Sequence, residues 1–379
     1  MKILFLDQSG QLGGAELSLL DVASPYRRDC LVGIFQDGPF HEALEQRDIP
    51  VQVLTHQLPQ IRKESGLWQS LGSFGQLLPL IASVIRLSRN YDVIYTNTPK
   101  AFIVGAIASL LGRRPLVYHL RDILSAEHFS PANLRLLVTL ANLTASRVIA
   151  NSQATRAAFI KSGGNPDIAT VVYNGFQPEQ YQQLQEAATH LRQKLKMEGK
   201  FVVGHFSRLS AWKGQHILLE ALTACPEEVV ALFVGDALFG EDDYVQQLHQ
   251  QVQALKLRNR VRFLGFRADV PQLMVACDLV AHSSTAPEPF GRVIVEAMLC
   301  GTPVVAAAAG GAMELVDHGQ TGWLTSPGDA SKLAEVINYC YQNRDDIQAI
   351  AHQAQVEASQ RFHLATTRLQ INKQLQEIT

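Results

Sequence analysis

The chain has 379 residues, of which 47% are hydrophobic and 18% charged, and its formal net charge is −2. This length predicts two or three domains, because single hydrophobic cores seldom grow beyond about 250–300 residues. The apolar content excludes an intrinsically disordered chain, and the balance of acidic and basic residues excludes the broad positive field of nucleic-acid-binding proteins.

The first half of the chain repeats one theme, a short apolar run followed by a turn and a helical pattern. Near-continuous runs of Val, Ile and Leu are typical of parallel strands that are covered on both faces. Their alternation with helical patterns predicts a doubly wound α/β sheet. The runs occupy residues 3–6, 31–35, 51–54, 93–95, 116–118, 148–150 and 170–173.

A polar, Gln-rich stretch at 177–199 contains no apolar run and indicates a boundary between two domains. A second α/β series follows it, and residues from 331 onward are helical throughout. We therefore expect an N-terminal domain over 1–178 and a second domain over 196–362. The six apolar runs of the second series are 202–206, 230–234, 261–264, 279–282, 304–306 and 322–324.

The sequence contains few features that indicate a cellular location. The five cysteines include no CxxC pair, so the sequence indicates neither a disulfide framework nor a zinc site and favours the reducing cytoplasm. The apolar run at the N-terminus is too short for a signal peptide. Residues 67–87 are rich in apolar side chains with basic flanks, a pattern that fits either a peripheral membrane contact or, more simply, a core-facing helix.

Several candidate ligand-binding elements follow predicted strands. Gly13 and Gly14 precede the first predicted helix, where backbone N–H groups can approach an anion, although a tight turn explains them equally well. His119 ends a strand, and Gly310 begins another strand-to-helix turn. In open α/β sheets, ligands bind beyond the carboxyl ends of the strands, so all of these positions are candidates.

Two carboxylates, Glu288 and Glu296, stand with seven residues between them. Glu288 follows a strand, and Phe290 and Gly291 open the helix in whose second turn Glu296 lies. Carboxylates accept hydrogen bonds from hydroxyls, and a helix N-terminus favours negative charge, which suits a phosphorylated polyhydroxyl ligand. Spacing alone leaves solvated surface glutamates as the simpler interpretation.

Two cations, Arg208 and Lys213, follow the strand at 202–206 and precede a helix. Positive side chains are poorly placed at a helix N-terminus unless an anion lies between them. A diphosphate would supply that anion, with the guanidinium as a fork and the ammonium as a point charge.

Together these elements, in this order, resemble the retaining nucleotide-sugar glycosyltransferases of family 4, which have the GT-B architecture and an EX7E motif. The resemblance covers essentially the whole chain and is most specific in the second half. It is carried by GGAEL, YHLRD, VVYNGF, FSRLSAWKG, LGFRADV, EPFGRVIVEAMLCGTPVVA and AGGAMELV.

The resemblance implies two Rossmann-like domains that face each other across a cleft, with a C-terminal helix at 363–379 that packs back on the first domain. It implies catalytic roles for His119, Arg208, Lys213 and Glu288. It implies donor binding by Gly13, Gly14, Phe266, Arg267, Phe290, Gly291, Arg292 and Glu296.

Within that set, Arg208 and Lys213 would hold the diphosphate, Glu288 the sugar hydroxyls and Glu296 the ribose. Phe266 and Arg267 would lie near the base. Ser207 departs from the glycine that the family usually has before the arginine.

The expected activity is transfer of a hexose-type sugar, with retention, from a nucleotide sugar to a glycan or lipid-linked oligosaccharide in polysaccharide biosynthesis. A UDP-sugar is the favoured donor. We expect no metal or other cofactor, because cations and helix N-termini would neutralise the leaving diphosphate. The expected location is cytoplasmic, including the cytosolic membrane face, with no nucleic-acid partner.

Two other functions remain as alternatives. A nucleotide-sugar epimerase would use the same fold without an acceptor, and a non-catalytic protein would bind a nucleotide sugar without turning it over. A nicotinamide-dependent dehydrogenase is disfavoured, since the chain has no GxGxxG motif in the loop after its first strand.

Overall fold

The computed structural model describes residues 1–55, 67–126, 128–237 and 240–379, with side chains in the first helix after the gap described from residue 78 onward. The chain divides into two compact units. The first comprises Met1–Gly175 together with Leu364–Thr379, and the second comprises Phe176–His363.

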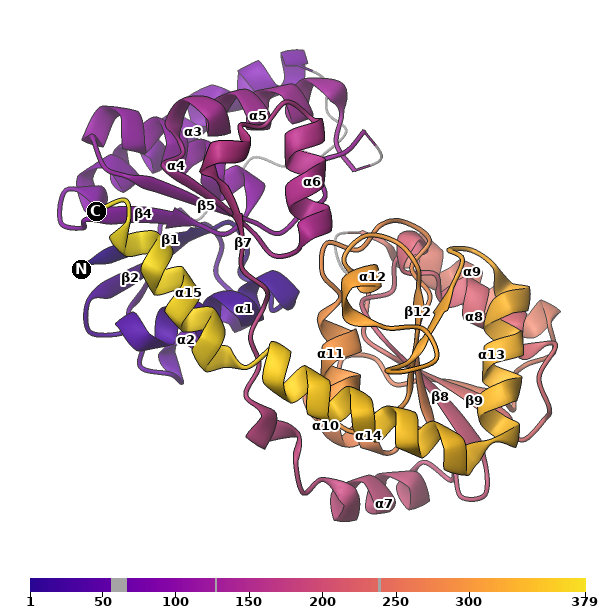
Figure 1. The fold of residues 1–379 in the computed structure, drawn as a ribbon. Coiled ribbons are helices and arrows are strands. Elements are labelled where there is room, and N and C mark those ends of the chain that lie inside the picture. Colours follow the sequence, from indigo (N-terminus) through magenta and orange to yellow (C-terminus); the bar gives the residue numbers. More distant parts are fainter. Residues whose placement is uncertain (56–66, 127, 238–239) are drawn as a thin grey trace. The chain divides into compact units, whose positions relative to one another are not determined.

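The first unit is built on a seven-stranded parallel sheet in the order β3-β2-β1-β4-β5-β6-β7 (Figure 1). Each predicted apolar run of the first half forms one of these strands. Their bounds are β1 (Ile3–Asp7), β2 (Cys30–Ile34), β3 (Val51–Val53), β4 (Val93–Thr96), β5 (Leu116–Leu120), β6 (Arg147–Ala150) and β7 (Ala169–Val171).

Helices cover both faces of this sheet (Figure 1). The strand order requires α3 (Leu67–Ser88), α4 (Pro99–Gly112), α5 (Pro131–Thr144) and α6 (Gln153–Lys161) to share one face, because right-handed crossovers in one direction lie on one side. The other face carries α1 (Gly14–Ala23), α2 (Pro39–Glu45) and the C-terminal α15 (Leu364–Gln376). Thus the last helix of the chain belongs to the first unit.

The second unit contains a six-stranded parallel sheet in the order β10-β9-β8-β11-β12-β13. The six predicted runs of the second half form its strands. Their bounds are β8 (Phe201–Phe206), β9 (Val229–Val234), β10 (Val261–Phe263), β11 (Leu279–His282), β12 (Val304–Ala307) and β13 (Trp323–Thr325).

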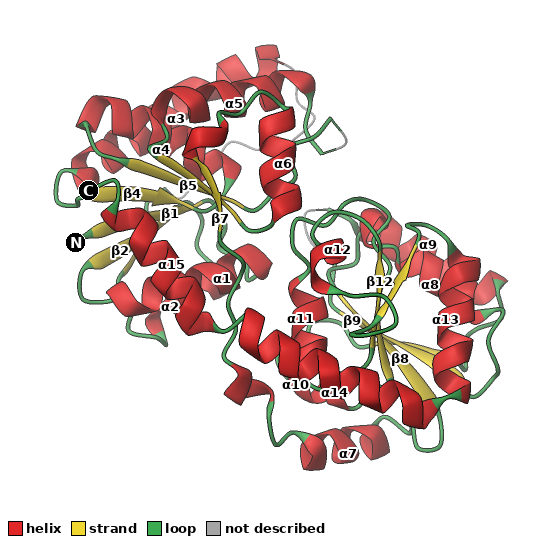
Figure 2. Cartoon of the chain, viewed as in Figure 1, coloured by secondary structure: helices red, strands yellow, loops and turns green. Residues whose placement is uncertain are grey.

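Helices again cover this sheet on both faces (Figure 2). One core forms against α8, α9 and α13, and α11 packs against α14 elsewhere. The bounds are α7 (Gln185–Lys194), α8 (Gln215–Leu222), α9 (Asp242–Ala254), α10 (Val270–Val275), α11 (Arg292–Leu299), α12 (Ala312–Leu315), α13 (Ala330–Gln342) and α14 (Arg344–Arg361).

The polar stretch at 177–199 is part of the second unit rather than a free linker. Its helix α7 packs against α10, and Arg192 donates to a carboxylate oxygen of Asp278 at 3.0 Å and to the Ala276 carbonyl at 2.9 Å. The division between the units therefore falls at Gly175 and Phe176, ahead of this stretch.

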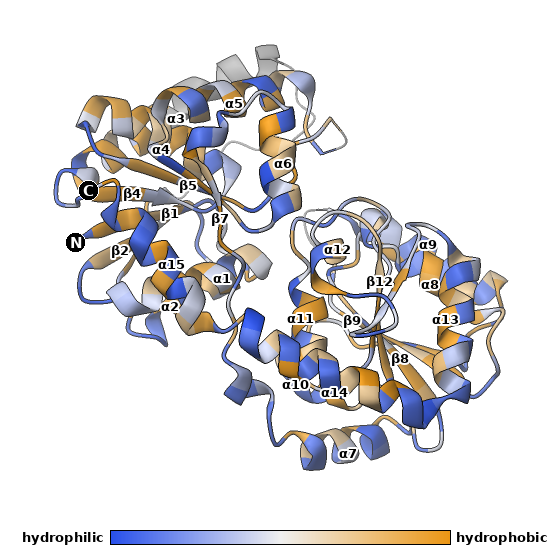
Figure 3. Ribbon diagram, viewed as in Figure 1, coloured by the Kyte–Doolittle hydropathy of each residue, from blue (hydrophilic) through white to orange (hydrophobic). Residues whose placement is uncertain are grey.

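The strands of both sheets are largely apolar, as Figure 3 shows by hydropathy, and the central strands are buried. All five cysteines are buried free thiols. In the described part of the chain, no helix combines the length and the apolar character that crossing a bilayer requires. For the segment at 67–87, the sequence favoured a core-facing helix over a membrane contact. Its side chains are described from residue 78 onward, and there Leu80, Ile81 and Val84 are buried in the core.

Candidate active site

The centre of the second sheet brings together two predicted site residues from distant parts of the chain. Lys213 follows β8 and Glu288 follows β11, and these two strands are hydrogen-bonded neighbours. The ammonium Nζ of Lys213 lies 2.7 Å from Oε2 of Glu288. Both side chains are mostly covered but keep some exposed surface, 16% for Lys213 and 13% for Glu288.

Glu288 has two further polar contacts that the sequence did not indicate. Because a carboxylate only accepts, His282 donates from Nε2 at 3.2 Å, and the Ser284 hydroxyl donates at 3.3 Å. Burial by itself would raise the pKa of the Glu288 carboxyl, but the charge of Lys213 and the hydrogen bond from His282 outweigh it and hold that pKa well below its usual range. Glu288 is therefore a charged acceptor at neutral pH.

Two glycines allow the loops around this pair to approach closely. Gly214 has a positive φ of 74°, and a Cβ there would lie 1.8 Å from the Ser283 carbonyl oxygen. Gly310 has a φ of 63°, and a Cβ there would lie 2.3 Å from the Glu288 carbonyl oxygen. Only glycine fits at these two positions, because the backbone of the loop after β11 lies directly against the turns that follow β8 and β12.

The ring of Trp212 lies close to both predicted cations, Arg208 and Lys213. The Lys213 ammonium lies 4.0 Å from the Trp212 ring centroid and the Arg208 guanidinium 5.8 Å from it, both within the range of cation–π attraction. The buried Gln215 donates to the Ser207 hydroxyl at 2.9 Å and to the Arg208 carbonyl at 2.8 Å. Ser207, where the family pattern has glycine, thus takes part in fixing the backbone of Arg208.

Helix α11 carries the second glutamate of the motif as predicted, in its second turn. Glu296 pairs with Arg292, one turn earlier, at 3.2 Å, and the Arg292 guanidinium lies 4.5 Å from the Phe176 ring centroid. Gly291 caps the helix with a φ of 99°. The Phe290 side chain is buried against Phe176, so only its backbone is left for the predicted ligand contact.

The loop after β10 carries the residues expected near a base. Phe266 is an exposed aromatic side chain, 67% accessible to solvent. Arg267 is held by Asp269 through two hydrogen bonds of 2.7 and 2.5 Å, and these bonds lower the pKa of Asp269. The ring of Phe266 is therefore available for stacking. Arg267, in contrast, is hydrogen-bonded within its own loop.

In the first unit, the predicted glycine turn caps helix α1. Gly13 donates its N–H to Glu16 Oε2 at 2.9 Å, and Gly14 is the first residue of the helix. Glu16 is buried, and burial together with the charge of Asp7 raises the pKa of its carboxyl. This arrangement explains the turn structurally, without requiring a bound anion.

His119, at the end of β5, is buried and has its tautomer determined by its neighbours. Arg121 donates from Nη2 to His119 Nδ1 at 3.2 Å, and since a guanidinium only donates, Nδ1 is an acceptor. The Tyr95 hydroxyl contacts the same nitrogen at 2.5 Å. Burial and the charge of Arg121 lower the pKa of His119, so the ring is neutral and its proton sits on Nε2. Nε2 has no hydrogen-bond partner among the described residues.

Arg121 belongs to a buried polar network that sequence reasoning missed. Its Nε donates to Asn97 Oδ1 at 2.5 Å and its Nη1 donates to Asn174 Oδ1 at 2.8 Å. Asn97 in turn donates to Asp7 Oδ2 at 2.7 Å. These residues end or follow β1, β4, β5 and β7, so the network lies at the carboxyl edge of the sheet. In the sequence, only the YHLRD motif pointed to this part of the edge.

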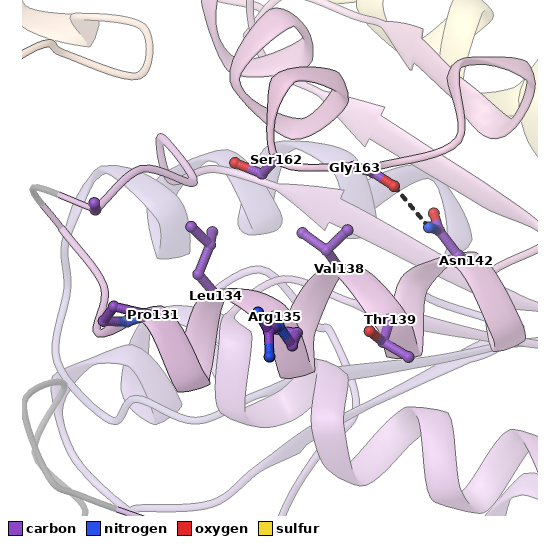
Figure 4. A pocket seen from close by; sticks show the side chains of 9 residues that line it. Pro131, Leu134, Arg135, Val138, Thr139, Asn142, Ser162 and Gly163 are labelled. Carbon is purple, nitrogen blue, oxygen red and sulfur yellow. Dashed lines mark hydrogen bonds between the residues drawn. The ribbon is translucent and has the colours of Figure 1, made fainter.

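A pocket of about 340 Å³ lies elsewhere in the first unit, along α5 (Figure 4). Leu134 and Val138 line it with Arg135 and Ser162, and Asn142 donates to the Gly163 carbonyl at 2.8 Å. None of the predicted site residues line this pocket. Among the described residues there is also no cluster of three or more His, Cys, Asp or Glu side chains placed to hold a metal ion.

Comparison with known proteins places this geometry in a family. Residues 40–180 match the family described as Glycosyltransferase Family 4, and residues 186–358 match the one described as Glycosyl transferases group 1. The crystal structure of HepE from Anabaena in complex with UDP-glucose is 59% identical, covers 100% of both chains and superposes with a TM-score of 0.94.

More distant relatives are also similar to this chain. Spore coat protein SA of Bacillus subtilis is 32% identical over 50% of this chain and 54% of its own length. The human alpha-1,3/1,6-mannosyltransferase ALG2 is 28% identical over 88% of this chain and 86% of its own. The chain spans about half the length of the curated relatives with the strongest matches. With HepE similar along its entire length, the chain belongs to the family 4 glycosyltransferases of GT-B architecture.

Proposed function

We propose that this protein is a retaining, metal-independent hexosyltransferase that takes glucose or a similar sugar from a UDP-sugar. The observation that carries the proposal is the Lys213–Glu288 pair at the carboxyl edge of the second sheet, beside Arg208 and Trp212. The donor assignment is supported by HepE, which has been crystallised with UDP-glucose and with UDP.

Donor binding would exchange the partner of Lys213. A diphosphate offers the ammonium a stronger anion than one carboxylate, and Arg208 adds a second cation from the same loop. Glu288, charged and already accepting from His282 and Ser284, would then accept hydrogen bonds from hydroxyls of the sugar. Glu296 would do the same for the ribose, and the exposed ring of Phe266 would stack on the base.

The bond that breaks joins the anomeric carbon to the diphosphate, and UDP leaves with the electron pair. Arg208 and Lys213 would neutralise the charge that grows on the leaving group, the electrostatic role that usually supplies the largest share of catalysis. His119 would donate from Nε2–H to a substrate oxygen, since its neutral tautomer presents a buried donor that has no partner among the residues that the structure describes. The acceptor hydroxyl forms the new bond on the face that the leaving group vacated, with its proton passing to the departing diphosphate.

We further propose that the acceptor is a glycan or a lipid-linked oligosaccharide and that the enzyme works in polysaccharide biosynthesis. The proposal is supported by CapM of Staphylococcus aureus, which is named as a capsular polysaccharide biosynthesis glycosyltransferase and is similar over 78% of the chain. NMR of the product formed from UDP-glucose would show whether the anomeric configuration is retained.

The proposal is tested by sugar transfer or donor hydrolysis with the Lys213→Ala variant. Removing one group that stabilises charge in the transition state lowers kcat by about 10²–10³ in comparable sites. The matched control is Lys332→Ala, which removes the lysine of an exposed Lys–Glu pair and should leave kcat unchanged. Unchanged turnover in Lys213→Ala would refute the diphosphate role, and loss of wild-type activity in EDTA would refute metal independence.

A further inference from the structure

A buried histidine lies against the loop at 207–214, which carries Arg208 and Lys213. His205 is the fifth residue of β8, whose other residues are apolar or glycine, and it is buried. Its ring centroid lies 5.7 Å from that of Phe233 on the neighbouring strand β9. Burying an imidazole in such a strand costs free energy unless its nitrogens form hydrogen bonds, so its polar contacts show what it contributes.

The contacts of the His205 ring determine which nitrogen carries the proton. Nε2 lies 3.1 Å from the carbonyl oxygen of Lys213, which can only accept, so Nε2 is protonated. Burial, together with the nearby His282, lowers the pKa of His205 to about 3, so the ring is neutral and Nδ1 is an acceptor. The Ser207 hydroxyl lies 3.4 Å from Nδ1. The single N–H of this ring is therefore directed at the backbone of Lys213.

Ser283 extends the same contact to the next residue of the loop. Nε2 of His205 also lies 3.2 Å from the Ser283 hydroxyl, and that hydroxyl donates to the Gly214 carbonyl at 2.8 Å. Ser283 directly follows β11 and is buried. Two successive carbonyls, those of Lys213 and Gly214, are thus held by buried side chains from two neighbouring strands of the sheet.

These hydrogen bonds fix the backbone from which the Lys213 side chain extends. In the proposed reaction, the Lys213 ammonium exchanges Glu288 for the diphosphate of the donor. An anchored backbone limits this exchange to the side chain, so that the ammonium reaches the same place in every catalytic cycle. The requirement is strict, because a misplacement of about 1 Å can lower a reaction rate about a hundredfold.

We propose that His205 is a positioning residue for the transferase reaction. By donating to the Lys213 carbonyl, and by holding Gly214 through Ser283, it fixes the Lys213 ammonium where negative charge grows on the leaving diphosphate. The inference rests on the proposed function, since His205 acts only through the backbone of Lys213.

The kinetics of UDP release from UDP-glucose by full-length His205 variants test the proposal. His205→Leu leaves an apolar side chain without a donor and should lower kcat roughly ten- to a hundredfold. The KM for UDP-glucose should change less than kcat, because the charge that Lys213 stabilises grows mainly in the transition state. His205→Gln should restore most of the lost kcat, since its amide N–H can donate to the same carbonyl.

The matched control is Thr302→Val, which also removes a buried donor to a backbone carbonyl of the second unit. The Thr302 hydroxyl donates to the Met274 carbonyl at 3.0 Å, and Thr302 precedes β12 at the amino edge of the sheet. Urea unfolding should show a similar loss of stability in both variants, with kcat unchanged in Thr302→Val. If kcat fell equally in the two variants, general destabilisation would explain the loss and the positioning role would be wrong.

A double variant separates this inference from the proposed function. In the Lys213→Ala background, His205→Leu should lower kcat no further, because the group that His205 positions is already absent. Losses that multiply would overturn the positioning role, and so would wild-type kcat in His205→Leu, provided that Lys213→Ala itself loses activity. Unchanged turnover in Lys213→Ala would instead refute the proposed function, and the inference with it.

Discussion

The carboxyl edges of the two sheets hold their cations in different ways. In the first unit, Arg121 is buried and donates to two amide oxygens and a histidine nitrogen. In the second unit, Lys213 donates to one carboxylate and remains partly accessible to solvent. The first cation donates hydrogen bonds to neutral side chains, and the second is paired with a carboxylate.

This difference indicates which edge can rearrange. Moving Arg121 would leave the side-chain oxygens of Asn97 and Asn174 as buried acceptors that have lost their donor, and each such group costs about 1–3 kcal/mol. Moving Lys213 leaves Glu288, which still accepts from His282 and Ser284. We infer that the first unit presents a rigid polar edge and that the second presents one whose ion pair can be exchanged for a ligand.

The largest expected effect comes from breaking the rigid edge. Arg121→Met should lower the free energy of unfolding by about 3 kcal/mol or more, since it removes the donor from several buried acceptors at once. Hydrogen exchange in peptides from β4 and β5 would measure the loss locally. Arg147→Met is the control, because it removes a partly exposed pair with Glu377 and should cost about 1 kcal/mol or less. Equal effects of the two variants would contradict the rigid network.

A second effect concerns pH. Because the folded protein raises the pKa of Glu16 above its ordinary value, the folded state holds a proton that the unfolded chain releases. Stability from this group is complete below the ordinary carboxyl pKa and is lost as the pH rises from there toward the raised pKa, by up to about 1.4 kcal/mol per pH unit.

Glu16→Gln should flatten this dependence, since its amide oxygen can still accept from the Gly13 N–H without titrating. Urea unfolding of the variant and the wild type, from mildly acidic to mildly alkaline pH, makes the comparison. Glu42→Gln, in α2, serves as the control because Glu42 is exposed to solvent. A wild-type slope that persists in Glu16→Gln would show that another group carries it.

The elements of both sheets could be predicted from the sequence because the central strands are buried on both faces and form near-continuous apolar runs. The edge strands β3 and β10 were found because each has only one exposed residue within its run. Lys213 and Glu288 could be placed at the same edge for the same reason, since both follow such runs. Their direct pairing could not be predicted, because it joins residues 75 apart and depends on which strands are neighbours in the sheet.

The polar network of the first unit was harder to find. Asp7 ends β1 and looks like an ordinary residue at the start of a turn, and its partner Asn97 lies 90 residues away. Likewise, in the sequence His282 and Ser284 look like ordinary residues at the end of a strand. Their role depends on the loop after β11, which brings Glu288 back to accept hydrogen bonds from both. These residues act through contacts across the sheet, and a single sequence holds no local pattern that reports such contacts.

The smallest effect probes the exchangeable pair itself. In Glu288→Gln, the side chain still accepts from His282 and Ser284 but no longer attracts Lys213 as an ion. UDP, which has no sugar hydroxyls to lose, should bind about two- to fivefold more tightly, since a largely but not fully covered pair of this kind is worth about 0.5–1 kcal/mol.

UDP-glucose should gain less than UDP, because its hydroxyls lose a charged acceptor, so the ratio of the two affinities separates the roles of Lys213 and Glu288. Calorimetry at low and high salt measures both, with Glu335→Gln, the partner of the exposed Lys332, as the control. If UDP instead bound Glu288→Gln more weakly than the wild type, Glu288 would be holding Lys213 in its binding position rather than competing for it. The second edge would then be as fixed as the first.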